Sequence, residues 1–210
     1  MIEKYFDGKR VAIVGSAPSV LQNEISHIDS HDVVVRINNF KLSDEAGWRT
    51  DVFFSFFGKS IRVGKELLKD TYLCMCKCPN GKIESEWHER TGRKLGNDFR
   101  YIYEDRKDWW FCETYIPTME RFMEYFSLLD NHIPTTGFSC ILDISRFDCE
   151  IYLTGFDFFS SRKHNVDQPW RPGNKEDPIG HVPEKEKEWI MDNKSRFIFD
   201  ERLKQIAVQR

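Results

Sequence analysis

The sequence predicts an α/β fold: a single Rossmann-like domain spanning residues 1–210, with a mostly parallel central sheet flanked by helices. Hydrophobic, β-branched strands alternate with segments of helical spacing, an order that is typical of parallel sheets. Two of these strands end in turns of small residues. The chain of 210 residues is long enough for one sizeable core and short for two, and no repeat or linker divides it.

The first half of the chain is expected to supply four strands. Each is a short run rich in Val, Ile, Phe or Cys, and the fourth is stopped by the turn residues at 78–81. The predicted elements are the strands Val11–Val14, Val33–Ile37, Asp51–Phe57 and Thr71–Lys77, a helical turn at Ser19–Ile25 and a helix at Ile61–Lys69.

The second half contains stronger helical periodicity. Met119, Phe122 and Phe126 recur on one face of a predicted helix. The predicted elements are the strand Phe99–Tyr103, the helices Thr118–Leu129 and Thr136–Phe147, the strand Glu150–Gly155, a helix from Pro183, the strand Arg196–Phe199 and a helix from Glu201. Residues 158–180 are polar and rich in Pro and Gly. Because long loops in compact domains usually have a function, we expect a mobile lid there.

The charge balance argues against a nucleic-acid partner. The chain has 31 Lys and Arg against 34 Asp and Glu, a net charge of −3, whereas polyanion-binding domains are usually basic. No apolar run reaches the roughly 20 residues that span a bilayer, and residues 1–7 lack the pattern of a signal peptide. We therefore expect a cytoplasmic protein. Its many aromatic side chains could line an acceptor site or form a rim for peripheral attachment to the inner face of the membrane. The oligomeric state is left open.

The cysteines are expected to be structural. Cys74, Cys76 and Cys78 alternate along one predicted strand, so their side chains share one face and act as small buried hydrophobic groups. A metal site would need further ligands, and His88 is the only nearby candidate. We expect reduced thiols and no metal.

The first small-residue turn is a candidate phosphate site. Gly15, Ser16 and Ala17 follow a buried strand, but the glycines of a dinucleotide fingerprint and the lysine of a P-loop are missing. A plain tight turn is the alternative. Arg36 and Asn38 end the next strand, where polar side chains usually need a partner or a ligand. We expect Asn38 to contact a ligand and Arg36 to form a structural ion pair.

The second turn precedes an apolar helix. Thr135, Thr136 and Gly137 can present hydroxyl and N–H groups to a phosphate at the helix N-terminus, although simple N-capping is equally compatible with them. The strand that follows this helix ends in Gly155, Phe156 and Asp157, and we expect both turns to face one crevice.

A candidate general base lies near the C-terminus. His181 stands just before a predicted helix, and Glu186 lies five residues further on, where its carboxylate could orient the imidazole ring. A surface histidine beside an unrelated charged run is the alternative.

Taken together, these segments resemble the motifs of sialyltransferases. The first turn with residues 28–38 resembles the large sialyl motif of the animal-type family, and residues 134–137 with 150–155 resemble its small motif. His181 and Glu186 fit the His-x-x-x-x-Glu of the very small motif, and His164 lies where a third motif carries a histidine. The chain is also similar to the Campylobacter-type bacterial enzymes at residues 36–40, 151–158 and 179–181. The match spans residues 11–190.

The resemblance implies the sialyltransferase variant of the GT-A glycosyltransferase fold and a specific reaction. A nonulosonic acid, most simply sialic acid, would pass from its CMP ester to a hydroxyl of a glycan acceptor, with inversion. Asn38 would contact the nucleotide, and residues 135–137 its ribose or phosphate. His164 would support the leaving phosphate, and His181 would deprotonate the acceptor. Neither a metal nor a further cofactor is implied, because CMP carries a single phosphate.

Some positions depart from the resemblance. Ser16 stands where both families usually have Asn, and Phe159 takes the place of one of the Campylobacter-type tyrosines near the leaving phosphate. Three alternatives therefore stay open on the same fold: a CMP-Kdo transferase, a CMP-sugar hydrolase and a nucleotide-binding module without catalysis.

Overall fold

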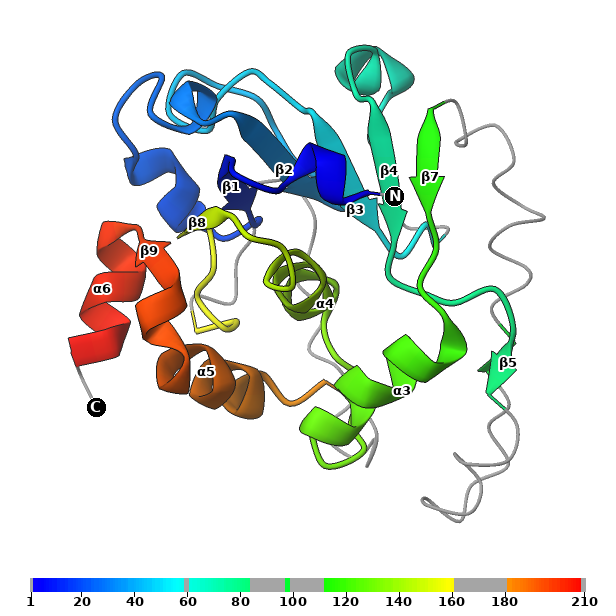
Figure 1. The fold of residues 1–210 in the computed structure, drawn as a ribbon. Helices are drawn as coiled ribbons and strands as arrows, with labels where there is room; N and C mark the ends of the chain where they lie inside the picture. Colours follow the sequence, from blue (N-terminus) through cyan, green and yellow to red (C-terminus); the bar gives the residue numbers. More distant parts are fainter. Residues whose placement is uncertain (1, 59–60, 84–96, 99–111, 161–180, 209–210) are drawn as a thin grey trace.

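The fold is built on one seven-stranded sheet (Figure 1). The computed structural model describes residues 2–58, 61–83, 97–98, 112–160 and 181–208. The sheet has the order β7-β4-β3-β2-β1-β8-β9, and all six of its pairings are parallel. Its strands are β1 (Arg10–Val14), β2 (Val33–Ile37), β3 (Val52–Ser55), β4 (Leu73–Cys76), β7 (Glu113–Tyr115), β8 (Glu150–Thr154) and β9 (Phe197–Phe199). A separate antiparallel pair joins β5 (Lys82–Ile83) to β6 (Asn97–Asp98).

The strand order reverses between β1 and β8. From β1 the chain adds β2, β3, β4 and β7 on one side, whereas β8 and β9 are added on the other. In open parallel sheets, ligands bind at the carboxyl ends of the strands beside such a reversal. The topology therefore points to the turns that follow Val14 and Thr154.

Within the described residues, four α-helices accompany the sheet: α3 (Met119–Leu128), α4 (Thr136–Ile144), α5 (Pro183–Asp192) and α6 (Glu201–Val208). Short 3-10 turns occur at η1 (Glu3–Tyr5), η2 (Pro18–Gln22), η3 (Ile28–Ser30), η4 (Lys65–Leu68) and η6 (Lys194–Arg196). Helix α4 packs on β2 and β3 and leads directly into β8, so it runs opposite to the strands. Its N-terminus therefore lies at the carboxyl edge of the sheet.

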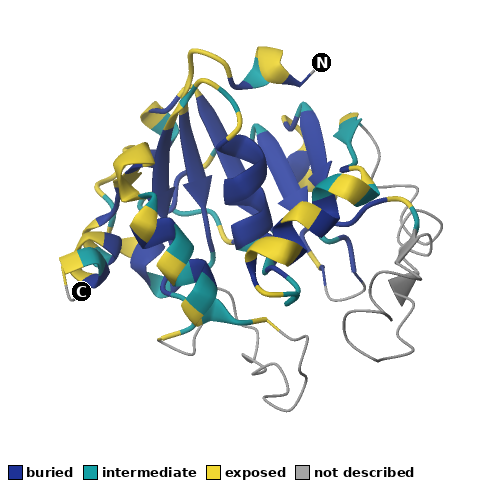
Figure 2. Cartoon of the chain, turned by 60° about the horizontal axis from the view of Figure 1, so that its bottom comes forward, coloured by how far each residue is buried: buried dark blue, intermediate teal, exposed yellow. Residues whose placement is uncertain are grey.

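The core explains why α4 is so apolar. Eight of its residues are buried, because the sheet lies on one side and α3 and α5 lie nearby on the other (Figures 1 and 2). Along each central strand, alternate side chains enter different clusters. Leu73 and Met75 belong to the cluster that contains α4, whereas Cys74 and Cys76 belong to a cluster on the other face of the sheet.

Most of the predicted elements that fall within the described residues are present, and the differences concern short or terminal segments. The region predicted as a helix at Ile61–Lys69 forms only the 3-10 turn η4, because Gly64 has an extended backbone just before it. The helix predicted to reach Phe147 ends at Ile144. Strand β7 was not predicted, because three residues are too few for a periodic signal. The predicted strand Phe99–Tyr103 lies outside the described residues.

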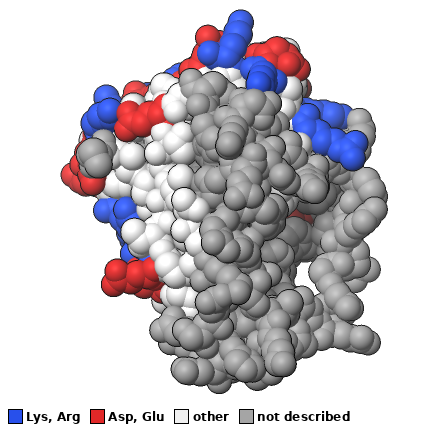
Figure 3. All heavy atoms as spheres, turned by 90° about the vertical axis from the view of Figure 1, so that its right-hand side faces the viewer, with Lys and Arg blue, Asp and Glu red and all other residues white. Residues whose placement is uncertain are grey.

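The predicted burial of Cys74, Cys76 and Cys78 is confirmed, and none of the six cysteines, all of which are described, forms a disulfide. In the described part of the chain, no helix combines the length and the apolar character that a membrane crossing requires. On the face seen in Figure 3, the described acidic and basic residues lie interspersed along its edges.

Candidate active site

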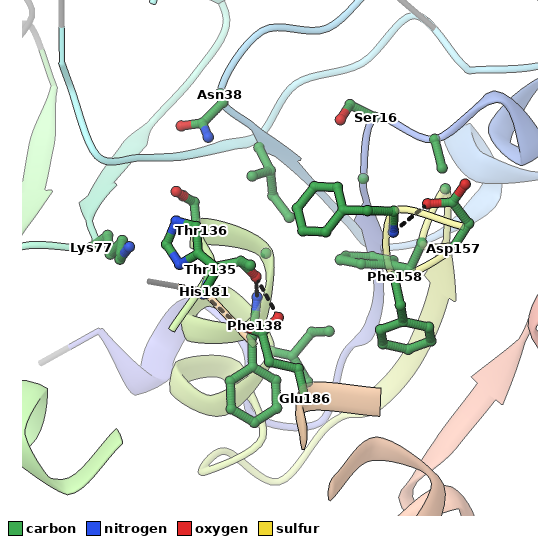
Figure 4. Close-up of a pocket in the computed structure, with 18 of the residues that line it drawn as sticks. Ser16, Asn38, Lys77, Thr135, Thr136, Phe138, Asp157, Phe158, His181 and Glu186 are labelled. Atoms are coloured by element: carbon green, nitrogen blue, oxygen red, sulfur yellow. Dashed lines mark hydrogen bonds between the residues drawn. The ribbon is translucent and has the colours of Figure 1, made fainter. Parts of the chain in front are cut away.

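A cavity of about 570 Å³ opens at the carboxyl edge of the sheet (Figure 4). Its described walls are the segments that follow β1, β2, β4 and β8, the first turn of α4, and the beginning of α5. Every predicted site residue that the structure describes lines it: Gly15, Ser16, Ala17, Asn38, Thr135, Thr136, Gly137, Gly155, Phe156, Asp157, His181 and Glu186. The volume lies within the usual range of about 300–1,000 Å³ for small-molecule sites.

The two turns at the strand reversal are packed directly against each other. A Cβ atom on Gly15 would lie 2.3 Å from the Gly155 carbonyl oxygen, and Gly155 has a φ of +75°. The N–H of Ala17 donates to the Gly155 oxygen, and the N–H of Gly15 donates to Thr154. These glycines are needed for the close approach of two backbones. Their N–H groups serve the fold, since that of Gly155 donates to buried Asp200.

Asn38 presents one end of its amide to the cavity. Its Oδ1 accepts hydrogen bonds from the Ser55 hydroxyl at 3.0 Å and the Phe56 N–H at 3.3 Å. Because both partners donate, the amide nitrogen is left as the outward group. Asn38 has a φ of 52°, a left-handed conformation that asparagine tolerates better than most residues. The side chain can therefore donate to a ligand acceptor.

At the beginning of α4, Thr135 has a structural role, whereas Thr136 and Gly137 are candidates for ligand binding. Thr135 is the N-cap: its Oγ1 accepts from the Phe138 N–H, while its own N–H and hydroxyl donate to Glu186. Both of its donors are thus used within the protein. The N–H groups of Thr136 and Gly137 belong to the first turn, which has no partners within the helix. They are the groups that can face an anion.

Glu186 does not hold the His181 ring, which corrects the predicted pairing. It accepts from the Thr135 N–H at 2.6 Å and from the Thr135 hydroxyl at 2.7 Å. The carboxyl group is 4% exposed, and burial raises its pKa to about 7 against the opposing effect of both Thr135 bonds. Since Pro183 starts α5, Glu186 lies on the helix's first turn and points toward α4. Its contacts anchor α5 to the N-cap of α4.

The His181 ring is oriented instead by a backbone carbonyl. Its Nδ1 lies 2.7 Å from the Ile133 oxygen. A carbonyl oxygen can only accept, so Nδ1 carries the proton, and in the neutral ring Nε2 is the basic nitrogen. His181 is exposed and lines the cavity, an arrangement that suits a general base.

Strained backbone closes the cavity on the β8 side. Phe158 and Phe159 both have positive φ values, 52° and 60°, which bulky residues rarely adopt. The Asp157 carboxylate accepts from the Phe159 N–H at 3.0 Å and holds this turn. Such strain is common in binding sites. The predicted catalytic residue His164, and most of the predicted lid at 158–180, lie outside the described residues.

Arg36 is structural, but not through the predicted ion pair. It is completely buried, and its guanidinium donates to the carbonyl oxygens of Arg49 and Ala46, both at 2.8 Å. It also lies over the Phe40 ring. Burial lowers its pKa to about 10, although Asp29 and Asp51 oppose this effect. Backbone carbonyls, rather than a carboxylate, accept from Nε and Nη2, and Nη1 is buried with no hydrogen-bond partner among the described residues.

The sequence interpretation assigned no role to Lys77, which also lines the cavity. The available signal was the same as for Asn38: a polar residue at the carboxyl end of a buried strand.

Searches with the sequence matched no family model and no curated protein. Comparison with solved structures gave several matches. The sialyltransferase CstII from Campylobacter jejuni, in complex with the substrate analogue CMP-3FNeuAc, is 20% identical with a TM-score of 0.57; the match covers 91% of this chain and 81% of that one. A mammalian sialyltransferase is 16% identical with a TM-score of 0.57, covering 91% and 68%. The CstII complex with CMP and a trisaccharide acceptor has a TM-score of 0.52 at 21% identity, covering 91% and 80%.

These structures agree with the two families that the sequence motifs resemble. Their identities are low, so the agreement concerns the backbone and not the individual site residues. The fold of this chain is therefore that of the sialyltransferases, and the predicted fold class is confirmed.

Proposed function

We propose that the protein is an inverting, metal-independent glycosyltransferase that moves a nonulosonic acid from its CMP ester to a hydroxyl of a glycan acceptor. One observation carries most of this proposal: the imidazole of His181 is oriented by the Ile133 carbonyl through Nδ1 and lines a cavity of suitable size, which is the arrangement of a general base. The fold and the CMP complexes of its structural neighbours support the choice of donor.

The reaction is a single displacement. The acceptor oxygen attacks the anomeric carbon while Nε2 of His181 removes its proton. The bond between the anomeric carbon and the phosphate oxygen breaks, and CMP leaves with the electron pair. Because attack and departure occur on opposite faces of that carbon, the configuration inverts. Base catalysis of this kind contributes about 10²–10⁴-fold.

The leaving phosphate is assigned to the first turn of α4. The N–H groups of Thr136 and Gly137 and the positive end of the helix dipole favour negative charge at this position. Glu186 supports the arrangement by holding the Thr135 N-cap. Asn38 donates to the nucleotide, and His164 retains its proposed role on the phosphate through the motif resemblance.

The test is to incubate the protein with CMP-Neu5Ac or CMP-Kdo, with and without a panel of glycan acceptors, in the presence of EDTA. We expect acceptor-dependent CMP release and a glycoside of inverted configuration, identified by NMR. CMP release from CMP-Kdo but not from CMP-Neu5Ac would identify Kdo as the transferred sugar. Equal CMP release with and without acceptor would indicate a hydrolase. Binding of CMP without turnover of either donor would favour the non-catalytic module. A strict requirement for Mn²⁺ would contradict the mechanism.

A further inference from the structure

Lys77 occupies an unusual position for a lysine. It follows β4 directly, and its N–H donates to the Ser55 carbonyl at 2.9 Å, which continues the ladder with β3. Alternation along the strand places its side chain on the same face as Leu73 and Met75, and this is the face that α4 covers. The side chain therefore enters the cavity at the carboxyl edge, near the level of the α4 N-terminus. Figure 4 shows it across the cavity from Asp157.

Lys77 is a buried residue, and its ammonium group has no close partner among the described residues. Lys77 is 8% exposed, and within the described part of the chain no hydrogen bond or ion pair engages its side chain. Glu186 lines the same cavity, but both of its oxygens are bonded to Thr135. A buried cation is costly unless it is paired, so an unpartnered lysine in a binding cavity calls for a compensating anion.

The charges around the cavity indicate what that anion is. Lys77 is the only lysine or arginine among the described residues that line it, where the acidic residues are Asp157 and Glu186. The Thr136 and Gly137 N–H groups at the start of α4 add a second feature that favours an anion. Burial lowers the pKa of Lys77, while Cys78 and Glu186 raise it. A negatively charged ligand would further stabilise the protonated form.

We propose that Lys77 binds an anionic oxygen of the donor substrate, together with the first turn of α4. This inference rests on the proposed function for the identity of the donor. A CMP-nonulosonate carries two such groups, the carboxylate of the sugar and the phosphate of the nucleotide. Both offer the same chemistry to an ammonium group: a charge-assisted hydrogen bond in a site with little competing water. Lys77 is thus a substrate-binding residue in addition to those of the motifs.

The experiment compares Lys77→Met with the wild type by calorimetry, using CMP and the non-transferable analogue CMP-3FNeuAc. Methionine keeps the unbranched shape and most of the length of the side chain and removes its charge. If Lys77 binds the carboxylate, the analogue should bind about 10- to 100-fold more weakly and CMP should bind as before. If it binds the phosphate, both ligands should weaken by a similar factor. Lys69→Met is the control, because Lys69 is exposed and outside the cavity.

Two results would overturn the inference, and they can be distinguished. If the wild type binds both ligands and Lys77→Met binds them equally well, Lys77 has no role in binding and the proposed function stands. If the wild type binds neither ligand, the proposed function fails and the inference fails with it. Circular dichroism and thermal unfolding check that the variant is folded. Lys77→Gln, which keeps a polar group without the charge, provides a second measurement if Lys77→Met is unstable.

Discussion

The chemistry of single side chains in the cavity depends on which of their atoms are already bonded within the protein. Thr135, a predicted phosphate ligand, has both of its donors engaged by Glu186. The oxygen of Asn38 accepts from Ser55 and Phe56, which leaves its nitrogen toward the cavity, and Nδ1 of His181 is bonded to the Ile133 carbonyl. These bonds separate residues that maintain the site from those that can contact a substrate.

Replacing His181 tests the proposed base. His181→Ala should lower kcat by about 10²–10⁴-fold, because the variant lacks the base that removes the acceptor proton. The Kd for CMP should stay nearly unchanged. Steady-state kinetics and calorimetry measure the two quantities. His27→Ala is a suitable control, because His27 is an exposed histidine outside the cavity. Wild-type turnover by folded His181→Ala would remove this residue from the mechanism.

Glu186 should make the stability depend on pH. Burial raises its pKa to about 7 in the folded protein, from an ordinary value of 4.5. Between these values the folded state retains a proton that the unfolded chain has lost, so this contribution is complete below about pH 4.5 and disappears as the pH rises through about 7. The full shift corresponds to about 3 kcal/mol.

Urea unfolding of the wild type and Glu186→Gln at several pH values measures this effect. The free energy of unfolding of the wild type should fall relative to that of the variant between about pH 4.5 and 7. Glu188→Gln, at an exposed position on the same helix, should behave like the wild type. Parallel curves for wild type and Glu186→Gln would show that Glu186 titrates normally.

At the scale of elements, the site depends on how two strand ends and two helix starts meet. The turns after β1 and β8 contact each other through Gly15 and Gly155, and α5 is joined to α4 by the Glu186–Thr135 pair. The backbone contact between the glycines is the tightest of these, and it lies where the strand order reverses.

Gly155→Ala should disturb that contact. The new Cβ would lie 2.7 Å from the Gly15 oxygen, at a φ of +75°. Gly8→Ala is a matched control, because Gly8 has a φ of +69° with no atom within 4 Å of the new Cβ. The positive φ alone should cost about 1–2 kcal/mol at both positions. We expect Gly155→Ala to cost more than Gly8→Ala in urea unfolding and to weaken CMP binding. If both variants lost the same free energy of unfolding, the turns after β1 and β8 would be able to move apart without a measurable cost.

At the scale of the whole molecule, the binding site gathers segments from most of the described chain. The lining residues extend from Gly15 to Ile190, so ligand binding should stabilise the domain as a unit. A ligand that binds only the folded state adds about 2.7 kcal/mol at a concentration of 100 times its Kd.

CMP should therefore raise the unfolding temperature. For a chain of this size, the stabilisation corresponds to about 5–10 °C. Differential scanning calorimetry with CMP, with UDP and with CMP plus EDTA measures it. We expect the same increase for CMP with and without EDTA, and little increase for UDP. A shift that disappears in EDTA would contradict metal independence, and a larger shift with UDP would contradict the nucleotide assignment.

Much of the fold could be predicted from local patterns. The strands Val33–Ile37 and Glu150–Thr154 are mostly apolar and almost entirely buried, as expected for strands covered on both faces, and the start of α4 follows a threonine N-cap. The failures were short or weakly patterned elements. Strand β7 has only three residues, and the segment around η4 has enough apolar residues for a helix, but an extended Gly64 interrupts it.

The sequence by itself determined the α/β class, the two small-residue turns and many of the residues at the cavity, because hydrophobic alternation and turn chemistry are local properties. Only the tertiary structure decided the roles within that set. The partners of His181 and Glu186 lie 48 and 51 residues away, and the position of Lys77 facing α4 depends on the packing of that helix on the sheet. Hydrogen bonds between distant segments are decided by the packing of the whole chain, which no local pattern contains.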